Sequence, residues 1–234
     1  MSRQPDLVLL TGDLTHNGSD AEWAEYKDRL GALAAPSESL AGNHDHNITE
    51  LRGHRSRTAG PLHLVLVDSS EDKFTNDDAA WLDAELSAHA DQITAIAIHH
   101  PPFETGIWWM DCVGLQGKEK FKEVVRRHPQ VIKILSGHVH RPIQTSWGGC
   151  SLWVCPSTSV TVAGDLDPDH VPAETAEGPS FSLHGCTGSG ANIGIVSHVV
   201  PVGDAAARTA IEEAAPDFVR WVRGVQANRA GLFD

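Results

Sequence analysis

The stretch Gly42-Asn43-His44-Asp45 places an amide, an imidazole and a carboxylate on three consecutive positions behind a glycine. Side chains of these types bind metal ions and phosphate groups. Three other clusters carry complementary groups, and each follows an apolar run: Gly12-Asp13, His99-His100-Pro101-Pro102 and Gly137-His138-Val139-His140. In open α/β sheets, ligands bind beyond the carboxyl ends of the strands. We therefore expect the four clusters to converge on one site.

Short apolar runs alternate with helical patterns along the first part of the chain. These patterns predict strands over 6–10, 62–68, 93–98 and 131–135. They predict helices from Ser19 to before Pro36, from Asn76 onward, and over 119–128. Ser19 and Glu22 have the spacing of a capping box. The basic segment 51–60 shows little periodicity, which favours a loop.

The pattern changes after residue 142. Shorter β-like runs over 143–147, 152–155 and 193–202 are separated by loops rich in glycine and proline, which favours antiparallel sheet. Apolar residues recur at helical spacing over 217–227 and predict a packing helix. We expect one α/β domain over 1–234, with 204–234 as a C-terminal helical packing segment.

Composition and charge narrow the class of partner. The chain has 234 residues, of which 41% are hydrophobic and 21% are charged, as is usual for a globular protein. Its 18 Lys and Arg against 31 Asp and Glu give a net charge of -13, which repels phosphate backbones at long range. No nucleic-acid polymer is therefore expected as a partner, and phosphate recognition should depend on metal cations.

The cysteines and the apolar runs indicate the compartment. Cys112, Cys150, Cys155 and Cys186 form no C-x-x-C pair. The sequence shows no leader pattern and no apolar run long enough to span a bilayer. These features predict a cytoplasmic protein with free thiols and no membrane partner.

The ligand types in the four clusters favour particular metals. Asp, Asn and His without cysteine suit manganese, iron or zinc better than a thiolate-held structural zinc. His138 and His140 are two positions apart, so on an extended strand end they would share a face and could serve two adjacent ions. Seven other histidines occur singly, and we expect them to be solvated or packed: His54, His63, His89, His128, His170, His184 and His198.

The four clusters, in this order, resemble the motifs of the calcineurin-like metallophosphoesterase superfamily. Within it, His99-His100-Pro101-Pro102-Phe103, with Thr105-Gly106-Ile107 and Met110-Asp111, is most similar to the bacterial class III cyclic-nucleotide phosphodiesterase and glycerophosphodiesterase branch. The resemblance extends over about residues 5 to 200, and four ordered motifs are a specific signal. It implies a four-layer αββα sandwich with a two-metal site at the strand ends.

The resemblance also implies a role for each motif residue. Asp13 would bridge two metal ions. The coordination of one ion would be completed by Asn43, His99 and His138, and the other ion would be bound by His140. His44 would donate a hydrogen bond or proton near the leaving oxygen, and Asp45 would orient its imidazole. The implied reaction is in-line attack of a metal-bound hydroxide on the phosphorus of a small phosphodiester.

One departure from the family pattern changes the expectation. The family begins with a strand that ends in Asp-x-His and supplies the other ligands of the ion that His140 binds, but no such motif precedes Asp13. We therefore expect an N-terminally truncated domain that lacks its first strand, with one complete metal site and one half-built site. The alternative is a degenerate homologue that binds metal or phosphate without turnover.

Two further features have competing interpretations. Trp108 and Trp109 could stack on a nucleobase or lie in a homo-oligomer contact, and the sequence leaves both open. Asp165, Asp167 and Asp169 alternate like a calcium loop. That interpretation fails, because histidine and alanine stand where the loop needs glycine and a bidentate glutamate.

Overall fold

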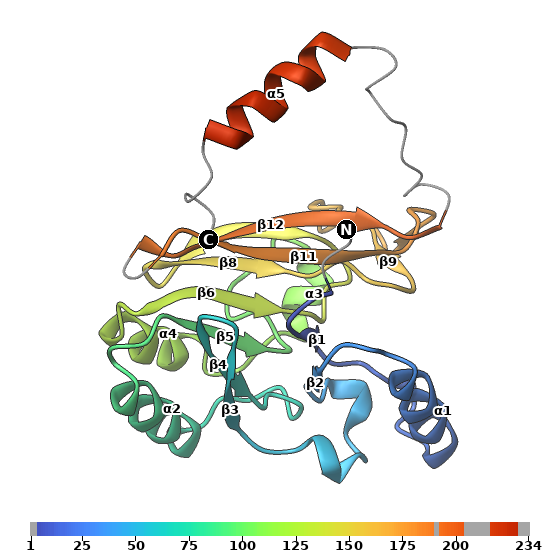
Figure 1. Cartoon of the computed structure of the whole chain (residues 1–234). Coiled ribbons are helices and arrows are strands. Elements are labelled where there is room, and N and C mark those ends of the chain that lie inside the picture. The colour runs from blue at the N-terminus through green and yellow to red at the C-terminus, as the bar shows by residue number, and fades with distance from the viewer. Residues whose placement is uncertain (1–3, 190–191, 204–215, 229–234) are drawn as a thin grey trace.

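A six-stranded mixed sheet forms the centre of the computed structural model, which describes residues 4–189, 192–203 and 216–228 (Figure 1). Its strand order is β3-β4-β5-β6-β8-β7. The strands are β3 (Arg55–Ala59), β4 (Leu62–Val67), β5 (Thr94–Ile98), β6 (Val131–Ser136), β7 (Ile143–Trp147) and β8 (Cys150–Val154). Strands β4, β5, β6 and β8 run parallel, so their carboxyl ends share one edge. The predicted α/β class is confirmed.

Helices cover one face of this sheet. Helices α2 (Asn76–Ala88) and α4 (Lys118–Arg127) pack on it through a core that contains Val65 and Val67 of β4 and Leu82 and Leu86 of α2 (Figure 1). The alternate residues of β4, Leu64 and Leu66, belong to a second core cluster. Strand β4 is thus buried on both faces, which explains its continuous apolar run.

Smaller sheets and a helix cover the opposite face. The parallel pair β1 (Val8–Leu10) and β2 (Ser37–Ser39) contributes to the second core cluster through Leu9 of β1 and through Leu40, which directly follows β2. The antiparallel hairpin of β11 (Ser180–Thr187) and β12 (Gly194–Pro201) adds Ile195. Helix α1 (Asp20–Gly31) lies beyond β2, where the Tyr26 and Ser39 hydroxyls are 2.5 Å apart. The order helix, sheet, sheet, helix follows the predicted sandwich.

The remaining elements are short or lie near the ends of the chain. They are 3₁₀ turns over Asn43–Asp45 and Thr49–Leu51, helix α3 (Trp108–Cys112), the strand pair β9 (Thr161–Val162) and β10 (Glu174–Thr175), and helix α5 (Pro216–Asn228). The expected C-terminal helix is confirmed, but Trp221 is 65% exposed, so its packing role stays a prediction. The rest of segment 204–234 lies outside the described residues. None of the described helices is both long enough and apolar enough to cross a membrane.

The predicted loop over 51–60 is wrong in its second half. Residues Arg55–Ala59 form edge strand β3, antiparallel to β4. Its outer side chains face solvent or ion partners, so it lacks the apolar signal of a buried strand. Arg57 Nη1 lies 2.7 Å from Glu38 Oε1, and Arg55 Nε lies 3.4 Å from Glu38 Oε2. Strands β2 and β11 were also not predicted, whereas the Ser19 capping box at α1 is confirmed.

Candidate metal centre

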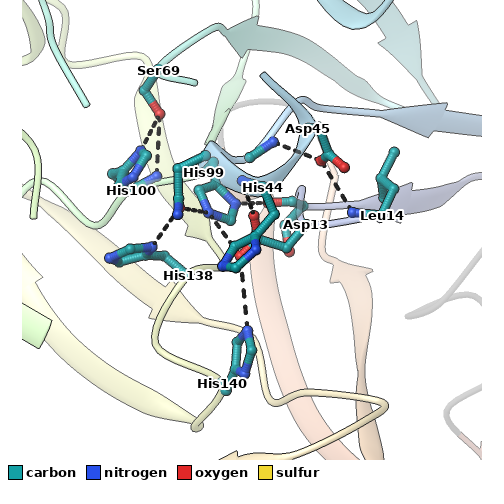
Figure 2. A network of polar contacts seen from close by, with 12 residues as sticks. Asp13, Leu14, His44, Asp45, Ser69, His99, His100, His138 and His140 are labelled. Atoms are coloured by element: carbon teal, nitrogen blue, oxygen red, sulfur yellow. Dashed lines mark hydrogen bonds and ion pairs between the residues drawn. The ribbon is translucent and has the colours of Figure 1, made fainter. Parts of the chain in front are cut away.

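The four motif clusters meet at the carboxyl ends of the strands (Figure 2). Asp13 follows β1, Asn43 opens the turn after β2, and His99 and His138 follow β5 and β6. The Asn43 Oδ1 atom lies 3.2 Å from His99 Nε2 and 3.1 Å from His138 Nδ1. The structure thus brings an amide oxygen and two imidazole nitrogens from three distant segments to one point.

The Asp13 carboxylate lies beside this point. Its Oδ2 atom is 3.4 Å from His99 Nε2 and 3.9 Å from His140 Nε2, and its Oδ1 accepts the His44 backbone N–H at 3.1 Å. Burial would raise the pKa of Asp13, but the contacts with His140 and His99 hold it well below its usual value. An ionised carboxylate between two imidazoles is therefore the stable form.

The backbone is held in an unusual conformation at these residues. Among the residues that the structure describes, only four non-glycine residues have a positive φ, and three of them are Asp13 (55°), His138 (68°) and His140 (55°). A left-handed backbone costs free energy for a residue with a Cβ, and such strain is found at functional sites when the surrounding structure enforces it. The fold therefore expends stability to aim these three side chains.

Two glycines allow the loops to approach one another closely. Gly12 has a φ of 100°, and a Cβ there would overlap His99 Nδ1. A Cβ at Gly42 would overlap the Asp13 carboxylate. Glycine is therefore required for steric reasons at the positions that precede Asp13 and Asn43 in the motifs.

The protonation of the two central histidines fits a metal ligand. His99 Nδ1 donates a hydrogen bond to the Thr11 carbonyl at 2.6 Å, which leaves Nε2 facing Asn43 and Asp13. Histidines that bind metals usually donate their other ring N–H in this way. Burial lowers the pKa of His99, but the Asp13 carboxylate outweighs it and raises the pKa, so metal binding would release a proton.

His138 is buried and neutral. Burial, followed by the neighbouring His99 and His100, lowers its pKa to about 2. Its Nε2 atom is buried and has no hydrogen-bond partner among the described residues. With Asp13, Asn43 and His99, it completes a set of oxygen and nitrogen donors that fits a divalent metal ion.

A third histidine supports the site from behind. His99, His100 and His138 each offer a ring nitrogen, and these atoms lie within 4.8 Å of one another. His100 is already engaged, because its Nδ1 lies 3.0 Å from Ser69 Oγ and its Nε2 lies 2.8 Å from Asp72 Oδ1. Ser69 and Asp72 were not predicted from the sequence. The signal that could have identified them is their position after β4, whose carboxyl end lies at the same edge of the sheet although it carries none of the four motifs.

Asp45 does not contact the His44 imidazole, so its predicted orienting role is wrong. Its buried carboxylate accepts hydrogen bonds from the Leu14, Thr15 and Gly42 backbone N–H groups at 2.9–3.0 Å and from the Thr15 hydroxyl at 2.8 Å. It therefore ties the Asp13 loop to the Asn43 turn. The His44 ring is held by the His16 carbonyl, 2.7 Å from Nδ1.

Residues 2–142 match the family model described as calcineurin-like phosphoesterase, and this match spans more than half of the chain. The chain belongs to the calcineurin-like phosphoesterase family. Members of this family are hydrolytic enzymes that bind divalent metals, and the donors described above provide for such ions. The resemblance carried by the four motifs is thereby confirmed.

Similar proteins agree with membership of the calcineurin-like phosphoesterase family. A probable cyclic nucleotide phosphodiesterase of Synechococcus is 33% identical over 73% of this chain and 70% of its own length. A probable glycerophosphodiester phosphodiesterase of Arcobacter nitrofigilis is 32% identical over 77% of this chain and 73% of its own. A dimetal phosphatase from Danio rerio shares the fold, with a TM-score of 0.52 at 16% identity over 64% of this chain and 72% of its own.

Proposed function

We propose that this phosphoesterase hydrolyses small phosphodiesters of the cyclic nucleotide or glycerophosphodiester class, with manganese, iron or zinc at the strand-end site. The carrying observation is the approach of His99 Nε2 and His138 Nδ1 to Asn43 Oδ1 beside the ionised Asp13. The substrate class follows from the names of the relatives in Synechococcus and Arcobacter nitrofigilis, which represent both kinds of diesterase.

The ligands of the proposal divide into two groups. Asp13, Asn43, His99 and His138 would hold one ion, and Asp13 and His140 would bind a second. Divalent ions bound at such a site lower the pKa of water and neutralise negative charge that develops on the phosphoryl group. The Thr11 carbonyl and the Asp45 carboxylate hold these ligands in position, because the first fixes the His99 ring and the second fixes the loop after Asp13.

His44 is the proton donor of the proposal. Its Nδ1–H donates to the His16 carbonyl and fixes the ring, and in the imidazolium form its Nε2–H would give the proton to the leaving oxygen. The ring also stacks on His16, with centroids 5.4 Å apart, and its side chain remains only half-buried. Substrate can therefore reach it without any rearrangement of the core.

The reaction is tested with a chromogenic phosphodiester, purified protein and added Mn²⁺. We expect turnover that a chelator abolishes and that added Mn²⁺ restores. A panel of 3′,5′-cyclic nucleotides, glycerophosphodiesters and monoesters then identifies the substrate class, and elemental analysis counts the ions. Metal binding without turnover of any ester would overturn the proposal and favour a degenerate, non-catalytic homologue.

The two tryptophans of α3 separate the substrate classes. Trp109 packs against the main core cluster, whereas Trp108 is 36% exposed and is the one of the two that is proposed to stack on a nucleobase. If the substrate is a cyclic nucleotide, Trp108→Ala should raise KM for it by about 10-fold, as expected from a stacking contact of 1–3 kcal/mol. The chromogenic diester is the control. Equal losses on both substrates, with a later elution on sizing, would instead place Trp108 in a homo-oligomer contact.

A cytoplasmic location completes the proposal. All four cysteines lie in the described part of the chain, and all are free thiols. Free thiols are usual in a reducing compartment. Fractionation of cells that express the protein tests this location.

A further inference from the structure

A second group of metal-ligating side chains lies at the amino ends of the parallel strands. His63 is the second residue of β4, Glu85 lies in the last turn of α2, and His89 directly follows that helix. Each residue offers one ligand atom, and these atoms all lie within 4.8 Å of one another. The Glu85 Oε1 atom is 3.1 Å from His63 Nε2 and 3.3 Å from His89 Nδ1. We call this group the His63 cluster.

Two polar atoms of the His63 cluster lack a hydrogen-bond partner, whereas His89 Nδ1 lies 2.9 Å from the Glu85 carbonyl. His63 is 4% exposed, and both its Nε2 and Glu85 Oε1 are buried without a hydrogen bond to any described residue. The two atoms are close but not aligned for a hydrogen bond. A buried polar atom without a hydrogen bond costs free energy, and one bound ion would satisfy both of these atoms.

The Asp83 carboxylate of α2 and His128, which directly follows α4, form a histidine–carboxylate pair that shows the difference. His128 Nε2 lies 2.9 Å from Asp83 Oδ1, and these two atoms do form a hydrogen bond. In the His63 cluster, the second imidazole stacks on the first with ring centroids 4.0 Å apart, and both rings face one carboxylate. Two nitrogen donors and one oxygen donor thus converge where an ion pair needs only one nitrogen.

We propose that His63, Glu85 and His89 bind one divalent transition-metal ion, zinc in preference to others, which ties the start of β4 to the end of α2. Two imidazoles and a carboxylate are a ligand set typical of zinc, whereas magnesium and calcium prefer oxygen donors alone. The side chains of Glu85 and His89 are 20% and 32% exposed, so water can complete the coordination. The sequence predicts that His63 and His89 are solvated or packed, and the proposal adds a ligand role to that packing.

The test counts zinc ions on the full chain and on two variants. We expect His89→Ala and Glu85→Gln each to bind one zinc ion fewer than the unaltered chain after gel filtration. Loss of a ligand should weaken the affinity for this zinc ion by more than about 10–100-fold, which is the typical effect of losing a residue that only supports a ligand by a hydrogen bond. The zinc-dependent rise in Tm should shrink in both variants, while the strand-end site keeps its Mn²⁺-dependent activity.

His128→Ala is the matched control, because it removes a histidine that forms a hydrogen bond with Asp83, a carboxylate of the same helix as Glu85. It should keep the full zinc count. The variants are compared only if their zinc-free circular dichroism and Tm match the unaltered chain. An equal zinc count in the unaltered chain, His89→Ala and Glu85→Gln would overturn the proposal, and so would an equal loss in His128→Ala.

Discussion

The two edges of the central sheet hold two ligand clusters that are built in different ways. At the carboxyl edge, the ligands come from loops, and Asp13, His138 and His140 adopt positive φ values. At the amino edge, the His63 cluster comes from a regular strand and the end of a regular helix, with no such strain. Strain and close glycine contacts occur where several loops must aim at one point. The regular elements bring three ligands together without that cost.

The largest expected effect is loss of the shared carboxylate at the carboxyl edge. Asp13→Ala should lower activity by at least about 10⁴-fold, the upper end of what one acid–base group contributes, because it removes a ligand of both ions. Asp169→Ala is a control on an exposed acid. Rates with added Mn²⁺ measure the effect, and a loss of less than about 10-fold would mean that Asp13 is not a ligand.

The next effect separates a proton donor from a ligand at the same edge. His44→Ala should lower turnover by about 10²–10⁴-fold while the metal content stays unchanged. The defect should shrink for esters with good leaving groups, since these need no proton. Metal analysis and rates on paired esters measure both properties. A drop in bound metal in His44→Ala would make His44 a ligand instead.

The carboxyl edge was largely predictable from the sequence, because each ligand is part of a local motif. Gly12-Asp13 and Gly137-His138 each follow an apolar run that predicts a strand, so the sequence places both motifs at strand ends, although the two strands lie in different sheets. The partners of His44 and Asp45 were not predictable. Both contacts are made with the loop after Asp13, about 30 residues away in sequence, and depend on how the two loops pack.

The amino edge left no signal in the sequence. His63 lies within an apolar strand, and Glu85 and His89 are four positions apart at the end of a helix. Only the packing of α2 on β4 brings the three together. The edge strand β3 was missed for a similar reason, since its arginines are stabilised by Glu38, which is distant in sequence.

A smaller effect tests the steric demand at the carboxyl edge. In Gly42→Ala, the new Cβ would overlap the Asp13 carboxylate and its backbone nitrogen, so the loop must shift. Such overpacking typically costs about 1–3 kcal/mol. Gly31→Ala is the control, because nothing lies near that position at the end of α1, and it should stabilise by up to about 1 kcal/mol. Denaturant unfolding measures both changes, and equal midpoints would show that the loops do not need the glycine.

The smallest expected effect is the coupling between the two edges of the sheet, which we expect to act independently. His63 lies four residues before the end of β4, which is about 13 Å along a strand that rises about 3.3 Å per residue. Substitutions separated by more than about 7–10 Å without shared partners usually act additively. His89→Ala should therefore change Mn²⁺-dependent turnover by less than about 2-fold, and its effect on the free energy of unfolding should add to that of His44→Ala within about 0.5 kcal/mol. A double-mutant cycle of these two substitutions measures the coupling. A larger coupling energy would show that the two clusters are energetically coupled through the sheet and do not act as independent sites.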